Sequence, residues 1–135
     1  TEISDSYQLI KNLTDKVALL HCVSSYPLDA NDANLICIQS LKNQFDCIIG
    51  YSDHTNGIEV PALAYAAGAQ IIEKHYRINE DQNCIDAPVS ITEVQMKKLI
   101  NKISEIDKIF GIGDLAVRPA EKETLAYRRH SLFNS

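Results

Sequence analysis

Two short apolar runs, each followed by polar residues and a histidine, constrain the fold of this chain more than any other feature. The first run is Ile48-Ile49-Gly50-Tyr51, followed by Ser52-Asp53-His54-Thr55, and the second is Ala69-Gln70-Ile71-Ile72, followed by Glu73-Lys74-His75-Tyr76. An alanine-rich segment over residues 58–67, closed by Gly68, separates the two runs. This pattern predicts a strand, a helix and a second strand, with a histidine at the end of each strand.

Apolar periodicity continues this alternation toward both ends of the chain. Residues 17–23 form an unbroken apolar run, which is typical of a strand buried on both faces of a parallel sheet. Thr92 and Gln95 have the spacing of a helix capping box. Helices are predicted over residues 2–13, 35–45, 58–67 and 94–110, with a last short helix from about residue 118.

Strands that alternate with helices indicate a parallel sheet with right-handed crossovers, and therefore an α/β fold. The spacing of the strands suits a (β/α)8 TIM-type barrel, but eight such units need roughly 250 residues. This chain has 135 residues and three predicted strands. Two architectures stay open on these grounds, a small open α/β sheet and a partial (β/α)8 barrel.

Composition narrows the class of protein and of partner. The formal charge of -5 argues against binding to nucleic acid or to an anionic membrane surface. No apolar run approaches the roughly 20 residues that span a bilayer. The four cysteines include no C-x-x-C pair, which favours reduced thiols in a cytoplasmic protein. The chain lacks an initiator methionine, so it is expected to be processed or cut from a longer protein.

The polar residues at the strand ends are the candidates for chemistry, because parallel α/β folds place their sites there. Strand alternation puts Ser52 with His54 on one face, and Glu73 with His75 on one face of the next strand. Neighbouring strands lie about 4.8 Å apart, so the two histidines are expected to share one metal ion. Ser24 and Ser52 would lie beside the metal as hydroxyl donors for an anion.

The residues around these candidates are expected to have structural or supporting roles. Lys74 is expected to face the helices, while Asp53 either orients a metal ligand or caps the next helix. By strand alternation His21 points away from Ser24, which favours a structural role. Glu73 is a carboxylate within a predicted buried strand and therefore needs a partner.

Several segments together resemble the sialic acid synthase family, whose members make nonulosonic acids from phosphoenolpyruvate and a hexosamine. The segments are Leu19 to Pro27, Ile49 to Glu59, Ala66 to Tyr76, Asp86, Gly113-Asp114, Arg118-Pro119, and Arg128-Arg129-His130-Ser131. The resemblance implies a (β/α)8 barrel of which residues 1–127 form the C-terminal part, strands six to eight. It also implies that residues 128–135 begin a linker to an antifreeze-like domain that this chain does not contain.

The resemblance assigns roles to individual residues. It implies that His54 and His75 bind a divalent metal, Mn²⁺ first with Mg²⁺ or Co²⁺ as alternatives, and act in catalysis together with Glu73. Ser24, Tyr26, Ser52 and Asp86 match residues that contact the substrates. The metal would polarise the aldehyde of an N-acetylhexosamine such as N-acetylmannosamine. The phosphoenolpyruvate methylene carbon would then attack the aldehyde, and phosphate would leave after water adds.

The resemblance also sets limits and leaves alternatives. The parent enzyme is expected to be a cytoplasmic homodimeric transferase, and this part alone is expected to be inactive, because other substrate-binding residues come from the first half of the barrel. The family commonly has Gly-Pro-Asp-His where this chain has Cys84-Ile85-Asp86-Ala87, which brings it closer to some pseudaminic acid synthases. The alternatives are a pseudaminic or legionaminic acid synthase, another metal-dependent barrel aldolase or isomerase, and a non-catalytic half-barrel interaction module.

Overall fold

A computed structural model describes residues 2–127 of the chain. The expected linker, residues 128–135, lies outside this range. The elements along the chain are α1 (Glu2–Lys11), β1 (Ala18–Cys22), α2 (Cys37–Gln44), β2 (Ile48–Asp53), α3 (Glu59–Ala66), β3 (Ile71–Lys74) and α4 (Glu93–Phe110). Short 3-10 helices occupy Ala30–Asp32, Ala87–Val89 and Pro119–Tyr127. No helix among the described residues combines the length and apolar character needed to cross a membrane.

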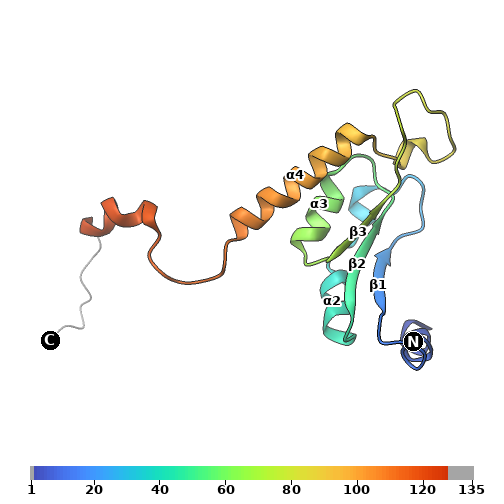
Figure 1. Cartoon of the computed structure of the whole chain (residues 1–135), viewed down its shortest axis with the longest axis horizontal. Coiled ribbons are helices and arrows are strands. Elements are labelled where there is room, and N and C mark those ends of the chain that lie inside the picture. The colour runs from blue at the N-terminus through green and yellow to red at the C-terminus, as the bar shows by residue number, and fades with distance from the viewer. Residues whose placement is uncertain (1, 128–135) are drawn as a thin grey trace.

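The three strands form one parallel sheet in the order β1-β2-β3. Figure 1 shows α2 and α3 on one side of this sheet and α4 running along α3, with the loop after β3 at the carboxyl ends of the strands. The prediction of parallel strands alternating with helices is confirmed, and this arrangement is the one expected for part of a (β/α)8 barrel.

Strand alternation gives the sheet two different faces. Ile49, Tyr51 and Asp53 of β2 are fully buried on the side of the helices. Ile49 and Tyr51 pack there in an apolar cluster with residues that include Leu28, Ile38, Val60 and Ala64. The other face carries the row Cys22, Ser52 and Glu73, which the register places side by side across the three strands.

The element boundaries differ slightly from the predicted ones. The strand predicted from Ala69 begins at Ile71, because Gly68 has a positive φ of 101° and ends the turn after α3. The chain nevertheless joins the sheet before this point, since the Gln70 amide donates to the Ile49 carbonyl at 2.8 Å. The predicted capping box of Thr92 and Gln95 is present at the start of α4. The last predicted helix is a 3-10 helix rather than an α-helix.

Candidate metal and anion site at the strand ends

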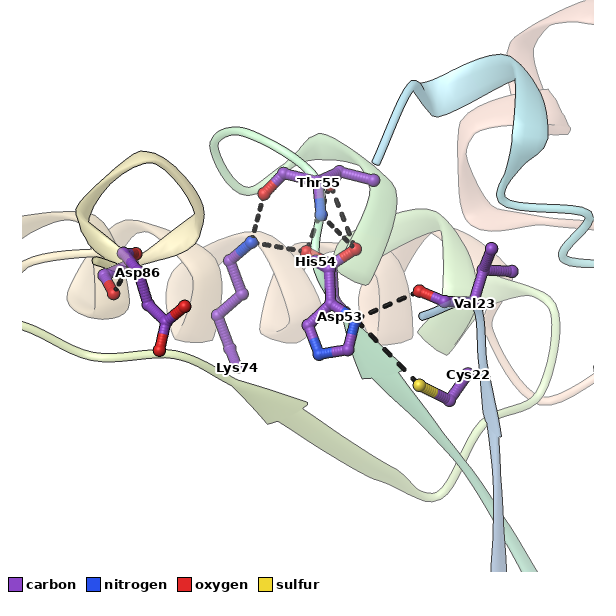
Figure 2. Close-up of polar contacts among 8 residues, drawn as sticks. Cys22, Val23, Asp53, His54, Thr55, Lys74 and Asp86 are labelled. Atoms are coloured by element: carbon purple, nitrogen blue, oxygen red, sulfur yellow. Dashed lines mark hydrogen bonds and ion pairs between the residues drawn. The ribbon is translucent and has the colours of Figure 1, made fainter. Parts of the chain in front are cut away.

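His54 follows β2 directly and is held by its backbone and by its ring. Its carbonyl accepts a hydrogen bond from the Leu28 amide at 2.9 Å, so the chain after β1 continues the sheet alongside it. Its Nδ1 lies 3.0 Å from the Val23 carbonyl oxygen, as Figure 2 shows. A carbonyl can only accept, so Nδ1 must carry the proton. This tautomer leaves Nε2 of a 4% exposed histidine with a free lone pair, which is the form that binds metals.

His75 follows β3 in the same way. Its carbonyl accepts from the Ile91 amide at 2.8 Å, which ties the strand end to the segment before α4. Its Nδ1 lies 3.7 Å from a carboxylate oxygen of Asp86. The backbone carbonyl of Asp86 in turn accepts from Ser90 Oγ at 2.7 Å. A carboxylate beside Nδ1 favours the proton on that nitrogen and again leaves Nε2 free.

The two histidine rings meet, as the sequence predicts. Their centroids are 5.3 Å apart with an angle of 65° between the planes. This separation is compatible with both imidazoles binding one ion, since metal–nitrogen bonds are about 2.1 Å long. No group of three histidine, cysteine or acidic side chains forms a metal cluster among residues 2–127. These residues would therefore supply two imidazole ligands, and metal binding itself stays a prediction.

Tyr26 covers the histidine pair. Its ring centroid lies 4.0 Å from that of His54 and 5.7 Å from that of His75. The residue is 54% exposed and is therefore accessible to a ligand from solvent. The position predicted to touch the sugar is therefore next to the predicted metal ligands. Ser24, the other candidate after β1, is exposed, and its role as an anion donor stays a prediction.

Ser52 and Glu73 form a second polar group below the histidines. Ser52 Oγ donates to a carboxylate oxygen of Glu73 at 2.7 Å. Both residues line a small open pocket of about 230 Å³ together with Lys74 and His75. Glu73 lies on the exposed face of β3, so the prediction of a buried carboxylate is wrong, and its bond to Ser52 is made at the surface. Binding of an anion by the Ser52 hydroxyl stays a prediction.

The structure adds an ion pair that the sequence pattern did not reveal. Lys74 faces the helices, as predicted, and its Nζ lies 2.6 Å from a carboxylate oxygen of Asp53. Asp53 neither caps α3 nor contacts a histidine ring, because its other bonds go to Thr55. The one sequence signal for this pair was strand alternation, which puts Asp53 of β2 and Lys74 of β3 on the same face of the sheet.

Two more polar side chains lie on the helix side of the sheet. His21 Nε2 contacts the Ala33 carbonyl at 2.8 Å, in keeping with a structural role. Tyr51 is fully buried, and its hydroxyl has no hydrogen-bond partner among the described residues. Burial, and next the negative charge of Asp53, raise the pKa of Tyr51 above its usual value.

Comparison with known proteins places this geometry in a family. The sequence model that describes the NeuB family matches residues 1–114. The N,N'-diacetyllegionaminic acid synthase of Legionella pneumophila is 36% identical over 87% of this chain and 35% of its own length. The pseudaminic acid synthase of Helicobacter pylori is 32% identical over 98% of this chain and 39% of its own length.

A solved structure extends the comparison to the fold. The crystal structure of the N-acetylneuraminic acid synthetase from Leptospira borgpetersenii superimposes with a TM-score of 0.84 and 44% identity. The match covers 94% of this chain and 45% of that protein. This chain thus spans less than half the length of the relatives and the solved structure named here.

Proposed function

Because this chain belongs to the NeuB family, we propose that it is the metal-binding part of a nonulosonic acid synthase. Such an enzyme condenses phosphoenolpyruvate with an N-acetylhexosamine and releases phosphate. The named relatives are legionaminic, pseudaminic and N-acetylneuraminic acid synthases, which supports this class of reaction. The observation that carries the proposal is the convergence of His54 and His75 at the ends of neighbouring strands.

The proposed metal ligands are Nε2 of His54 and Nε2 of His75. The Val23 carbonyl accepts from Nδ1 of His54 and so holds that imidazole in the metal-binding tautomer, and the Asp86 carboxylate, 3.7 Å from Nδ1 of His75, is proposed to favour the same tautomer there. A divalent ion there, Mn²⁺ by expectation with Mg²⁺ or Co²⁺ as alternatives, supplies a Lewis acid that polarises the sugar aldehyde. The remaining ligands would be water, substrate or groups other than these two side chains.

The remaining site residues are proposed to bind substrate and to manage protons. Ser52 would donate a hydrogen bond to an anionic group of phosphoenolpyruvate in place of its bond to Glu73, and the Glu73 carboxylate would accept or release a proton during the reaction. Ser24, which follows the neighbouring strand β1, is proposed to donate a hydrogen bond to the same anion. Tyr26 and Asp86, which flank the two histidines, contact the sugar.

The sugar, the cellular location and the assembly are also part of this proposal. We assign the sugar to the N-acetylhexosamines, with N-acetylmannosamine first and the precursors of legionaminic and pseudaminic acid as alternatives. Relatives named for each of these products match the chain. A cytoplasmic homodimeric parent enzyme is the expected setting.

A manganese titration tests the proposal. Calorimetry of the full chain with Mn²⁺ is expected to show one site, and His54→Ala and His75→Ala are each expected to weaken binding at least about tenfold. His21→Gln is the matched control, since His21 contacts the Ala33 carbonyl on the other side of the sheet. Unchanged affinity in both alanine variants would refute the metal site.

A turnover assay tests the proposal that this chain is only part of the catalytic unit. Phosphate release from phosphoenolpyruvate and N-acetylmannosamine is expected to stay at background with these 135 residues alone. The reason is that the chain spans 45% of the similar solved protein, so other substrate contacts are expected from outside it. Steady release of phosphate, abolished by His75→Ala, would overturn the expectation of inactivity while leaving the assigned chemistry in place.

A further inference from the structure

Each of the two histidines is preceded by a charged residue, and these two residues form a buried ion pair. Asp53 precedes His54, Lys74 precedes His75, and the parallel register places Asp53 directly beside Lys74. The carboxylate and the ammonium group are 2.6 Å apart, with side-chain exposures of 0% and 1%. The pair thus joins the last residue of β2 to the last residue of β3.

The same two side chains also hold the residue that follows His54. The Asp53 carboxylate accepts from the Thr55 amide at 3.2 Å and from Thr55 Oγ1 at 3.0 Å. Lys74 Nζ donates a further bond to the Thr55 carbonyl. Figure 2 shows the polar groups of Asp53, Thr55 and Lys74 gathered above the His54 ring. His54 therefore lies between two residues that are fixed to the neighbouring strand.

Stability alone does not explain why such a pair is here. Removing two charges from water carries a penalty that often equals or exceeds their attraction, so apolar residues of similar size can serve as well. Apolar packing is non-directional, whereas the ion pair forms only when Asp53 and Lys74 lie side by side. It therefore specifies one register and one spacing of the two strand ends. Because successive side chains of a strand point to opposite faces, fixing residues 53 and 74 on the helix side fixes 54 and 75 toward the other side.

We propose that Asp53 and Lys74 are positioning residues that hold the imidazoles of His54 and His75 at the separation needed to bind one divalent ion. In the structure the two ring centroids are 5.3 Å apart. When the ion pair holds this spacing, the site is preorganised, and metal binding does not have to order the strand ends. The part of the inference that concerns the ion rests on the proposed function, whereas the part that concerns ring spacing does not.

The decisive variant is the neutral double substitution Asp53→Asn with Lys74→Met. It leaves no unpaired charge in the core, and the asparagine carbonyl can still accept from Thr55. Lys102→Met is the matched control, since Lys102 pairs with Glu59 across α3 and α4 and both side chains are solvent-exposed. The readouts are urea unfolding, Mn²⁺ affinity by calorimetry, and proton–proton contacts between the two histidine rings in the metal-free protein by NMR.

The double variant is expected to unfold near the wild-type urea midpoint, yet to bind Mn²⁺ about 10- to 100-fold more weakly, as for other residues that orient metal ligands. The contacts between the rings are expected to weaken before any metal is added. Lys102→Met should change neither readout. A folded double variant with wild-type affinity and wild-type ring contacts would overturn the proposal.

Two further outcomes are informative. If the double variant does not fold, Thr55→Val removes only the hydroxyl bonds to Asp53, and a loss of Mn²⁺ affinity of a few-fold supports the proposal while no loss contradicts it. If the wild-type chain binds no Mn²⁺, the proposed function fails. The ring contacts of the metal-free variants then still decide whether the ion pair sets the spacing of the histidines.

Discussion

Ser52 Oγ donates a hydrogen bond of 2.7 Å to Glu73 Oε1, between neighbouring positions of β2 and β3. These two residues were predicted to serve an anion and the catalytic reaction separately, and the structure makes them partners. A hydroxyl has only one hydrogen to donate, so an anion that accepts a hydrogen bond from Ser52 must replace Glu73 as the acceptor. The bond to Ser52 also engages the Glu73 carboxylate, and this bears on whether Glu73 is itself a metal ligand.

Glu73→Gln separates the two-histidine site from the alternative of another metal-dependent aldolase or isomerase, in which Glu73 is a ligand. We expect the Mn²⁺ affinity to stay within about threefold of the wild-type value, because the carboxylate bonds to Ser52 and completes no three-residue cluster within residues 2–127. Calorimetric titration of this variant beside His75→Ala is the measurement. A loss as large as that of His75→Ala would favour direct coordination by Glu73.

Periodicity was sufficient to predict the parts of the site that depend on one strand at a time. Alternation placed Ser52 on the face of His54 and Glu73 on the face of His75, and the rule that parallel folds build sites at strand ends brought the histidines together. The capping box of Thr92 and Gln95 is equally local, and it is present as predicted. Such features need only the spacing of residues along the chain.

Features that depend on the register between strands could not be predicted in this way. The Asp53–Lys74 pair requires knowing which residue of β3 lies beside Asp53, and alternation alone does not tell this. The stacking of Tyr26 on His54 depends on the path of the chain after β1, where Leu28 pairs with Thr55 outside the named strands. The positioning network was missed because it is made of such contacts between distant segments.

Gly50 provides a test of how tightly the three strands pack. A Cβ atom there would lie 2.8 Å from the Ile71 carbonyl oxygen and 3.0 Å from a side-chain carbon of Leu20. Gly50→Ala is therefore expected to lower the free energy of unfolding by about 1–3 kcal/mol, the usual cost of overpacking. Urea unfolding measures this change.

Gly57→Ala is the comparison for this prediction. Gly57 has a φ of 79°, and a Cβ atom added there would have nothing within 4 Å, so only backbone strain of about 1 kcal/mol is expected. The Gly50 variant should also weaken Mn²⁺ binding, since a shift of β3 moves His75, whereas the Gly57 variant should lose stability with a smaller effect on binding. Equal and small effects of both substitutions would contradict tight packing between the strands.

The ionisation of Tyr51 is expected to make the stability of the protein depend on pH in the alkaline range. Its pKa is raised by burial and by the charge of Asp53, so the folded protein keeps the phenol proton at pH values where the unfolded chain, with a tyrosine pKa of about 10, has lost it. The unfolded state then binds fewer protons, and stability falls as the pH rises above about 10. Tyr51→Phe should lessen this fall, because it removes the ionisable group.

At neutral pH the same variant is expected to be at least as stable as the wild type. The Tyr51 hydroxyl is buried and makes no hydrogen bond of good geometry among the described residues, although it lies near enough to Asp53 for that carboxylate to raise its pKa. Its removal is therefore expected to relieve a desolvation penalty of about 1–3 kcal/mol. Urea unfolding at about pH 7 and about pH 10.5, on either side of the tyrosine pKa of the unfolded chain, measures both effects. Tyr65→Phe, which removes an exposed hydroxyl bonded to Asp107, is the control. A marked loss of stability at neutral pH in Tyr51→Phe would reveal a hydrogen bond to that hydroxyl.

Cys22 offers a chemical probe of the histidine pair. Its side chain is exposed, and its sulfur lies 3.9 Å from Nδ1 of His54 on the face that also carries Ser52 and Glu73. A bulky group attached to this sulfur would crowd the His54 ring. Alkylation with N-ethylmaleimide is therefore expected to weaken Mn²⁺ binding at least about tenfold, as other disturbances of a ligand's orientation do, and bound Mn²⁺ is expected to slow the alkylation. Mass spectrometry and calorimetry on the same samples measure both effects.

The second exposed cysteine makes the test specific. Cys84 lies in the loop after β3, and Cys37 and Cys47 are only partly exposed. In Cys84→Ser the effect of the reagent on Mn²⁺ affinity should remain, because Cys22 is still present next to His54. In Cys22→Ser the same treatment should leave the affinity unchanged, although Cys84 is modified. If the reagent weakens binding equally in both variants, the effect does not arise from the sulfur beside His54, and the crowding of that ring is not its cause.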